Sequence, residues 1–230
     1  MSAIVLFCGN AARDERQKNL PRGFLSRLHG ALLRRLRTLD AEVYVARHDD
    51  QSFLVGDAVF TIGTLGSQIE TALRHCFDRG HERVLIVAGD APIDERIVQR
   101  ALDATSPVIA ASRDGGFALA GFSELPSIDW DDVVADRAHA AQALRACLPF
   151  NELPRVDDID TLDDARRLLR DVPRGDFAPF IDPTFPRPLV SARAAPRAPP
   201  GVGQALQLVR VGQALQLVCV GQALQLVRTS

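Results

Sequence analysis

The sequence predicts an α/β fold in which helices cover a mixed, mostly parallel sheet. Short apolar runs rich in β-branched residues alternate with longer segments whose apolar residues recur at helical spacing. Two of the apolar runs are followed at once by an aspartate and small residues. With 230 residues and 47% hydrophobic content, the chain is long enough to bury a substantial core.

Five apolar runs have the length and composition of buried strands. They cover residues 3–8, 42–47, 83–88, 107–112 and 116–122. The fifth run follows the fourth so closely that an antiparallel or edge placement is expected rather than another crossover. The sheet is therefore predicted to be mixed.

Five segments have the apolar spacing of helices that cover a sheet. They cover residues 21–39, 65–79, 94–104, 135–148 and 161–169. In the last of them Thr161 suits the N-cap position, and Asp163 and Asp164 would lie in the first turn, where negative charge stabilises a helix. The alternation of strands and helices implies right-handed crossovers.

Charge and cysteine content limit the partners and the compartment. The net charge of −2 conceals an asymmetry, since residues 183–230 contain five arginines and no acid, which leaves 22 basic and 29 acidic side chains, a charge of −7, in residues 1–182. This excess argues against non-specific nucleic-acid binding. The four cysteines form no CxxC or zinc pattern, and no signal peptide or membrane span is recognised. We expect a cytoplasmic protein with reduced thiols and no membrane or nucleic-acid partner.

The composition divides the chain into three parts. Residues 1–172 are expected to form the folded domain, residues 173–201 a Pro-rich linker, and residues 202–230 a repetitive C-terminal tail. The tail repeats VGQALQLV three times with a nine-residue period. Three such units offer little area for a solenoid or an amphipathic anchor, so an unstructured tail is the favoured interpretation.

Asp90 is the strongest candidate for chemistry. It follows the buried run 83–88 and precedes Pro92, so rigid elements would fix its position. Ligands of open α/β sheets bind outside the carboxyl ends of the strands, and a carboxylate there could hold Mg²⁺ or Mn²⁺ against a diphosphate. The alternative is that Asp90 caps a helix that begins near Ile93.

Two other acidic motifs each have a functional and a structural interpretation. In Asp114-Gly115-Gly116 the paired glycines would let a ligand approach the backbone, or they form an ordinary Asp-Gly hairpin turn. In the acidic run 157–164 one carboxylate, of which Asp160 is our candidate, would be a second metal ligand, or the acids simply start a capped helix.

The segment Gly9–Pro21 contains Lys18, the only lysine of the chain. Gly9, Arg13 and Lys18 resemble the G-x-x-x-R-x-x-x-x-K-x-L-P loop of GT-A-like nucleotidyltransferases. That resemblance implies a backbone that wraps a nucleotide and a basic pair that meets its phosphates. The alternative is that Lys18 has no special role, and that one lysine is present by chance in a chain that strongly favours arginine.

Five short motifs, in this order, resemble the bacterial domain of unknown function 2064 family of the GT-A-like glycosyltransferase superfamily. The motifs are Gly63-Thr64-Leu65-Gly66, the run Val84–Pro92, the run Asp114–Gly121, Ile128-Asp129-Trp130 and Asp158–Thr161. The resemblance implies a Rossmann-like GT-A three-layer sandwich, the nucleotide-diphospho-sugar transferase fold. It places the catalytic residues at Asp90 and Asp114, with Gly115 and Gly116 in the nucleotide pocket. The segment Gly9–Pro21 departs from the family's K-x-P-x-P-G-x-x-K-T-R-L-like pattern.

The sequence therefore predicts a metal-assisted transferase that binds a nucleotide or nucleotide sugar and transfers a glycosyl group to a small acceptor. Mg²⁺ or Mn²⁺ on Asp90, with Asp160, would stabilise phosphate charge, and Arg13 and Lys18 would hold phosphate oxygens. Two alternatives remain open: a nucleotidyltransferase that activates a small phosphate compound, and a non-catalytic nucleotide-sugar-binding module.

Overall fold

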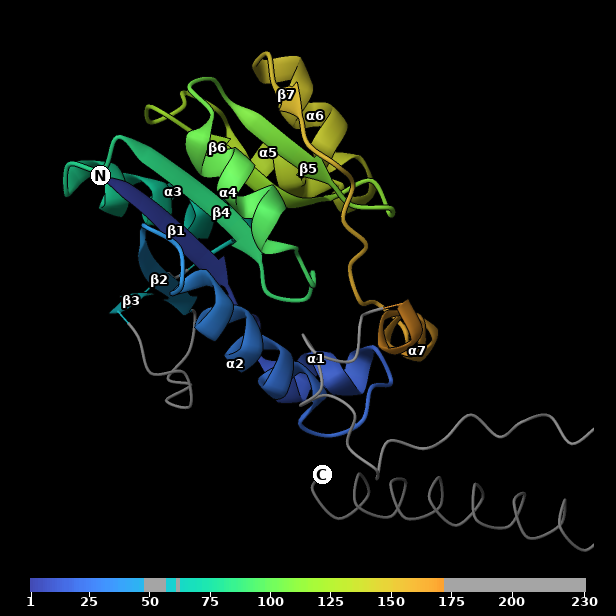
Figure 1. The fold of residues 1–230 in the computed structure, drawn as a ribbon. Helices are drawn as coiled ribbons and strands as arrows, with labels where there is room; N and C mark the ends of the chain where they lie inside the picture. Colours follow the sequence, from blue (N-terminus) through green and yellow to red (C-terminus); the bar gives the residue numbers. More distant parts are fainter. Residues whose placement is uncertain (48–56, 61–62, 172–230) are drawn as a thin grey trace, which may run out of the picture. The chain divides into compact units, whose positions relative to one another are not determined.

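Seven strands form one sheet in the computed structural model, which describes residues 1–47, 57–60 and 63–171 (Figure 1). The strand order is β3-β2-β1-β4-β6-β5-β7. In chain order the strands are β1 (Ser2–Phe7), β2 (Glu42–Arg47), β3 (Asp57–Phe60), β4 (Arg83–Ala88), β5 (Val108–Ala111), β6 (Phe117–Phe122) and β7 (Asn151–Glu152).

The sheet is mixed, as predicted. β1 pairs in parallel with both β2 and β4, and β2–β3 and β5–β7 are also parallel pairs. β6 runs antiparallel to both of its neighbours, β4 and β5, and lies between them rather than at an edge. The chain crosses from β1 to β2 on one side and returns to β4 on the other, so the strand order reverses at β1.

Seven α-helices and one short 3₁₀ helix accompany the strands in the described residues. They are α1 (Ala11–Gln17), α2 (Phe24–Leu36), α3 (Leu65–Asp78), α4 (Glu95–Asp103), α5 (Trp130–Ala135), the 3₁₀ helix η1 (Arg137–His139), α6 (Ala140–Cys147) and α7 (Leu162–Asp171).

The helices cover both faces of the sheet and complete a three-layer sandwich (Figure 1). Alternate strand residues point to opposite faces. On one face Val5 and Ile86 pack with Ile69 of α3 and Trp130 of α5 in a single buried cluster. The other face is covered by α2 and α4, whose buried apolar residues include four leucines of α2, namely Leu25, Leu28, Leu32 and Leu36. The predicted fold class is confirmed.

The single helix predicted over residues 135–148 is wrong. α5 ends at Ala135, and Asp136 then adopts an extended conformation in which its carboxylate accepts a hydrogen bond from Ala138 N at 3.1 Å. That capping bond begins η1, and α6 follows only from Ala140. A short polar side chain that competes for backbone donors has broken the helix here.

Three further observations bear on the predicted organisation. Cys8, Cys76 and Cys147, in the described part of the chain, form no disulfide. Within that part no helix is both long and apolar enough to cross a membrane. The predicted linker and repeat tail, residues 173–230, lie outside the described residues.

Candidate functional site

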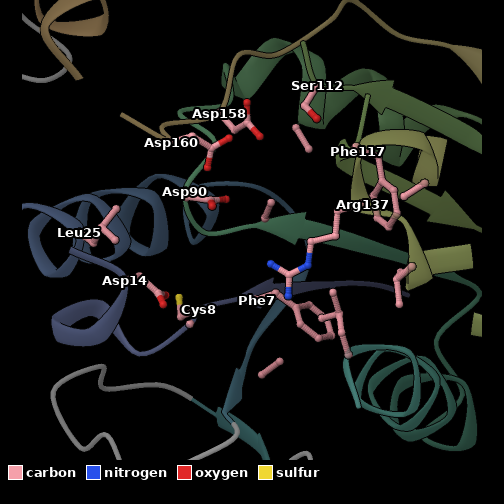
Figure 2. Close-up of a pocket in the computed structure, with 18 of the residues that line it drawn as sticks. Phe7, Cys8, Asp14, Leu25, Asp90, Ser112, Phe117, Arg137, Asp158 and Asp160 are labelled. Atoms are coloured by element: carbon pink, nitrogen blue, oxygen red, sulfur yellow. The ribbon is translucent and has the colours of Figure 1, made fainter. Parts of the chain in front are cut away.

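A cavity of about 620 Å³ opens beyond the carboxyl ends of β1 and β4, where the strand order reverses (Figure 2). Such a switch point is the usual ligand position in open α/β sheets, and the volume lies in the range of small-molecule sites. The predicted site residues that line it are Gly9, Arg13, Lys18, Asp90, Asp114, Gly116 and Asp160. Gly115 is not among the lining residues and packs elsewhere.

Asp90 reaches the cavity because Gly89 lets β4 end beside β1. Gly89 N donates to Phe7 O at 2.8 Å, and a Cβ at Gly89 would lie only 2.6 Å from that oxygen. The N-cap of α4 is Asp94, whose carboxylate accepts from Arg96 N at 2.7 Å. The interpretation of Asp90 as the cap of a helix from Ile93 is therefore wrong, and its carboxylate is available to the site.

Lys18 connects two of the predicted metal ligands. Its Nζ lies 2.7 Å from Asp90 Oδ2 and 2.8 Å from Asp160 Oδ1, and it also donates to Ile159 O at 2.8 Å. Burial lowers the pKa of Lys18, but the two carboxylates raise it by more, so the net pKa lies above its ordinary value. The predicted contact of Lys18 with phosphate stays a prediction, and a phosphate would have to compete with these carboxylates.

The segment expected to be a loop after β1 is largely the helix α1. Asn10 is its N-cap and accepts from Arg13 N at 3.0 Å. A Cβ at Gly9 would lie 2.2 Å from Asp14 Oδ2, so the Asp14 carboxylate packs against this glycine and would have to turn away from a larger residue. Arg13 is exposed in the first turn and lines the cavity.

Asp114, Asp158 and Asp160 form the strongest candidate metal centre. Each offers a carboxylate oxygen, and the three atoms lie within 4.8 Å of one another. Burial, followed by the neighbouring charges of Asp160 and Asp114, raises the pKa of Asp158 to about 7. Figure 2 shows Asp158 and Asp160 together on one wall of the cavity, above Asp90. Asp160 thus joins a set of three carboxylates that does not include Asp90.

The Asp114-Gly115-Gly116 motif is both a hairpin turn and part of the cavity wall. It joins β5 to β6, and Asp114 accepts hydrogen bonds from Gly116 N at 3.0 Å and from the Ser112 hydroxyl. Gly115 has a φ of +98°, and a Cβ there would lie 1.8 Å from Ala138 O. The two interpretations offered by the sequence are compatible, since the turn holds Asp114 at the site.

The acidic run before α7 divides between structure and site. Thr161 caps the helix as predicted, because Asp164 N donates to Thr161 Oγ1 at 3.2 Å and Asp164 accepts from Thr161 N at 2.9 Å. Asp158 and Asp160 instead turn to the cavity. Ile159 N donates to Asp90 O at 3.1 Å and fixes the segment between them.

Lining residues that were not singled out as site residues from the sequence include Asp14, His29, Arg137 and Asp158. Asp158 belonged to a recognised acidic run, but nothing in the spacing separated it from its neighbours. His29 lies among the leucines of α2, and only 2% of it is exposed. Burial lowers the pKa of His29 to about 4, so it is neutral at pH 7.

Comparison with solved structures shows the class of fold. The chain is similar to a protein from Desulfovibrio desulfuricans G20 that is provisionally named a nucleotide-diphospho-sugar transferase, with a TM-score of 0.59, 21% identity, and coverage of 77% of this chain and 92% of that one. The fold of this chain is thus the nucleotide-diphospho-sugar transferase fold. Two other solved structures are similar with lower TM-scores. A protein from Aquifex aeolicus VF5 has a TM-score of 0.48 and 17% identity, with coverage of 72% of this chain and 89% of that one. CMP:2-keto-3-deoxy-manno-octonic acid synthetase complexed with CTP has a TM-score of 0.46 and 15% identity, with coverage of 74% of this chain and 98% of that one.

The family model that the chain matches is the one that the sequence motifs indicated. Residues 35–135 match the family model described as "Uncharacterized protein conserved in bacteria (DUF2064)". The first four motifs lie inside this range, whereas Asp158–Thr161 and the segment Gly9–Pro21 lie outside it. A comparison with curated proteins finds no match.

Proposed function

We propose that the protein is a metal-assisted transferase that binds a nucleotide or nucleotide sugar in the 620 Å³ cavity and transfers a glycosyl group to a small acceptor. The observation that carries the proposal is the meeting of Asp114, Asp158 and Asp160 at the switch point of the sheet. A cytoplasmic location is part of the proposal, and the wide spacing of the four cysteines in the sequence, without a CxxC or zinc pattern, supports it.

The carboxylates fit a hard divalent cation. Mg²⁺ and Mn²⁺ bind carboxylate oxygens and commonly keep further positions for water and phosphate. The raised pKa of Asp158 reports the cost of burying this carboxylate and of placing it beside Asp160 and Asp114, a cost that a cation on the three carboxylates would offset. When bound, the cation would neutralise charge on the phosphate leaving group.

The remaining lining residues would bind and orient the ligand. Lys18 fixes the carboxylates of Asp90 and Asp160 in position through its two salt bridges. Phe7 and Phe117 belong to an apolar part of the wall that also includes residues of α3, namely Leu65 and Ile69. That part suits the flat, weakly polar faces of a base or sugar.

Thermal unfolding with Mn²⁺ across a set of nucleotides and nucleotide sugars tests the proposal. We expect a metal-dependent stabilisation by at least one ligand, because a ligand that binds only the folded state raises its stability. Asp158→Asn and Asp90→Ala should weaken the stabilisation, and Asp40→Asn, at an exposed position away from the cavity, should preserve it. The proposal would be contradicted if no ligand stabilised the protein, or if Asp158→Asn and Asp90→Ala were stabilised as much as the wild type.

One observation favours a second candidate, a non-catalytic nucleotide-sugar-binding module. The Lys18 ammonium already pairs with Asp90 and Asp160 and offsets one of their two negative charges, so part of the charge that a metal would supply is built into the chain. Binding that is equally tight with Mn²⁺ and with a chelator, without turnover, would favour this module over the transferase.

A further inference from the structure

The cationic side chains around the cavity differ in whether they are already paired. Lys18 is held by two carboxylates, as described above. Arg137 lines the same cavity, and within the described part of the chain its guanidinium makes no hydrogen bond or salt bridge, although its positive charge acts to lower the pKa of Asp14. Figure 2 shows its side chain extending into the cavity from the side of Phe117, with the guanidinium nitrogens foremost. The cavity therefore contains an arginine that is available to an anionic ligand.

The backbone beneath Arg137 is held tightly. Arg137 begins η1, where the Asp136 carboxylate accepts from Ala138 N. The turn at Gly115 packs against the next residue of η1, where a Cβ would lie 1.8 Å from Ala138 O, and Gly115 O accepts from Ala141 N at 3.1 Å. Any side chain at Gly115 would have to displace η1, so this glycine fixes the base from which Arg137 projects.

We propose that Arg137 is a phosphate-binding residue of the cavity, and that Gly115 serves to seat the η1 segment that carries it. This inference rests on the proposed function, and it names the charge-bearing partner for the diphosphate part of the ligand. A guanidinium presents its donors in a planar fork that matches two phosphate oxygens. This role also explains why Gly115, which the sequence predicted to be in the nucleotide pocket, does not line the cavity. Gly115 acts by positioning η1 rather than by touching the ligand.

Calorimetric titration in the presence of Mn²⁺ tests the inference with five probes: UDP, GDP, inorganic pyrophosphate, and the nucleosides uridine and guanosine. We expect Arg137→Ala to weaken diphosphate and pyrophosphate binding about tenfold to a hundredfold and to leave nucleoside binding unchanged. Arg137→Lys should lose less, since it keeps the charge but not the fork. Arg100→Ala removes an exposed arginine of α4 that does not line the cavity, and this variant should bind the probes like the wild type.

Gly115→Ala provides a second variant that leaves Arg137 in place. It should weaken binding of the same phosphate-bearing probes, and circular dichroism and urea unfolding show whether it is folded. If it is not folded, Arg137→Ala, at an exposed position, still decides the question.

Each outcome distinguishes this inference from the proposed function. Tight UDP or GDP binding that is equal in wild type and Arg137→Ala would overturn the inference and keep the function. Pyrophosphate binding that is lost in Arg137→Ala, with no preference for any nucleotide, would support the inference and count against the function. Binding of none of the phosphate probes by the wild type would overturn both.

Discussion

At the scale of single residues, the site is organised around a negative charge that the chain itself only partly neutralises. Lys18 is 19% exposed and offers its three donors to Asp90, Asp160 and the carbonyl of Ile159. Asp158 has no comparable cationic partner, and burial together with the negative charges of Asp160 and Asp114 raises its pKa. An uneven distribution of counter-charge of this kind is typical of a binding site rather than of a structural ion-pair network.

Replacing Lys18 by methionine, which keeps its length, should lower the free energy of unfolding by about 1–2 kcal/mol, because two partly exposed carboxylates would face each other without a cation. Urea unfolding without divalent ions measures this. Mg²⁺ should then restore more stability to Lys18→Met than it adds to the wild type. Arg74→Met, which breaks an exposed helical pair with Glu70, is the control and should change stability by less than about 0.5 kcal/mol. Equal losses in the two variants would refute the structural role of Lys18.

Asp158 should make the protein less stable as the pH rises. Its pKa is about 7 in the folded state and about 3.9 in the unfolded state, so between these values the unfolded chain releases the proton first. Stability is thus lost from about pH 4 to pH 7, and the whole loss persists above pH 7. Asp158→Asn carries no titrating proton and should be more stable than the wild type by about 2 kcal/mol at pH 8, with little difference at pH 4.

Urea unfolding at several pH values, with a chelator present, measures this difference. Asp40→Asn is the matched control, because Asp40 is exposed and does not line the cavity. If Asp158→Asn raised the free energy of unfolding equally at pH 4 and pH 8, the gain would come from burial of this side chain and not from the charge of the carboxylate.

At the scale of secondary-structure elements, α1 and α2 depend on one buried acid. Gly23, the N-cap of α2, makes no side-chain cap, and the Glu15 carboxylate from α1 accepts instead from Gly23 N and Leu25 N, both at 2.8 Å. Only 4% of Glu15 is exposed. A carboxylate at this helix start satisfies two donors and matches the helix dipole, so one side chain fixes the angle between the two helices.

Glu15→Ala should therefore lower the free energy of unfolding by about 2–4 kcal/mol, since it leaves those donors without a partner. Glu15→Gln, which keeps an acceptor oxygen and loses the charge, should cost about 1 kcal/mol. Urea unfolding measures both, and Glu70→Ala, in an exposed helical pair, provides the baseline. If Glu15→Ala were no worse than Glu70→Ala, the cap across the two helices would contribute nothing.

The elements that the sequence predicted are those with a strong apolar period. The sequence predicted β1, β4 and α2 because their buried residues form apolar runs in the two strands and a leucine stripe in the helix. α1 was missed because only Ala11 and Glu15 are buried in it, which leaves no apolar stripe to detect. Its helix results from the Asn10 cap and from the contact of Glu15 with α2, and contacts of this kind depend on residues distant in the sequence.

The same limit applied to the site. Asp90 and Asp114 were found because each follows a strand, a feature that can be read locally. The pairing of Lys18 with Asp90 joins residues 72 positions apart, and no local pattern encodes it. Arg137 was missed because the predicted helix 135–148 placed it within a regular turn, whereas Asp136 breaks the chain there and starts η1.

At the scale of the whole molecule, segments from both ends of the described chain meet at the β1–β4 switch point. α1 follows the first strand, and the Asp158–Asp160 segment precedes the last described helix, yet Lys18 and Asp160 form a salt bridge. The match to the family model spans residues 35–135 and includes neither of these segments. Asp90 and Asp114 lie inside the matched range, whereas Lys18, Asp158 and Asp160 lie outside it, so a protein could match the family model while differing in part of the charge of this site.

The last prediction concerns how much of the chain this site needs. The described core residues end with α7, and the compact unit that contains them runs from Met1 to Asp182. A chain ending after Asp182 should unfold at the same urea midpoint as the full chain and keep its Mn²⁺-dependent ligand stabilisation, because no residue of the candidate site is removed. A chain ending after Asp157 loses α7 together with Asp158 and Asp160, and it should lose the metal response. Failure of the longer variant to fold would place part of the stabilising core beyond residue 182.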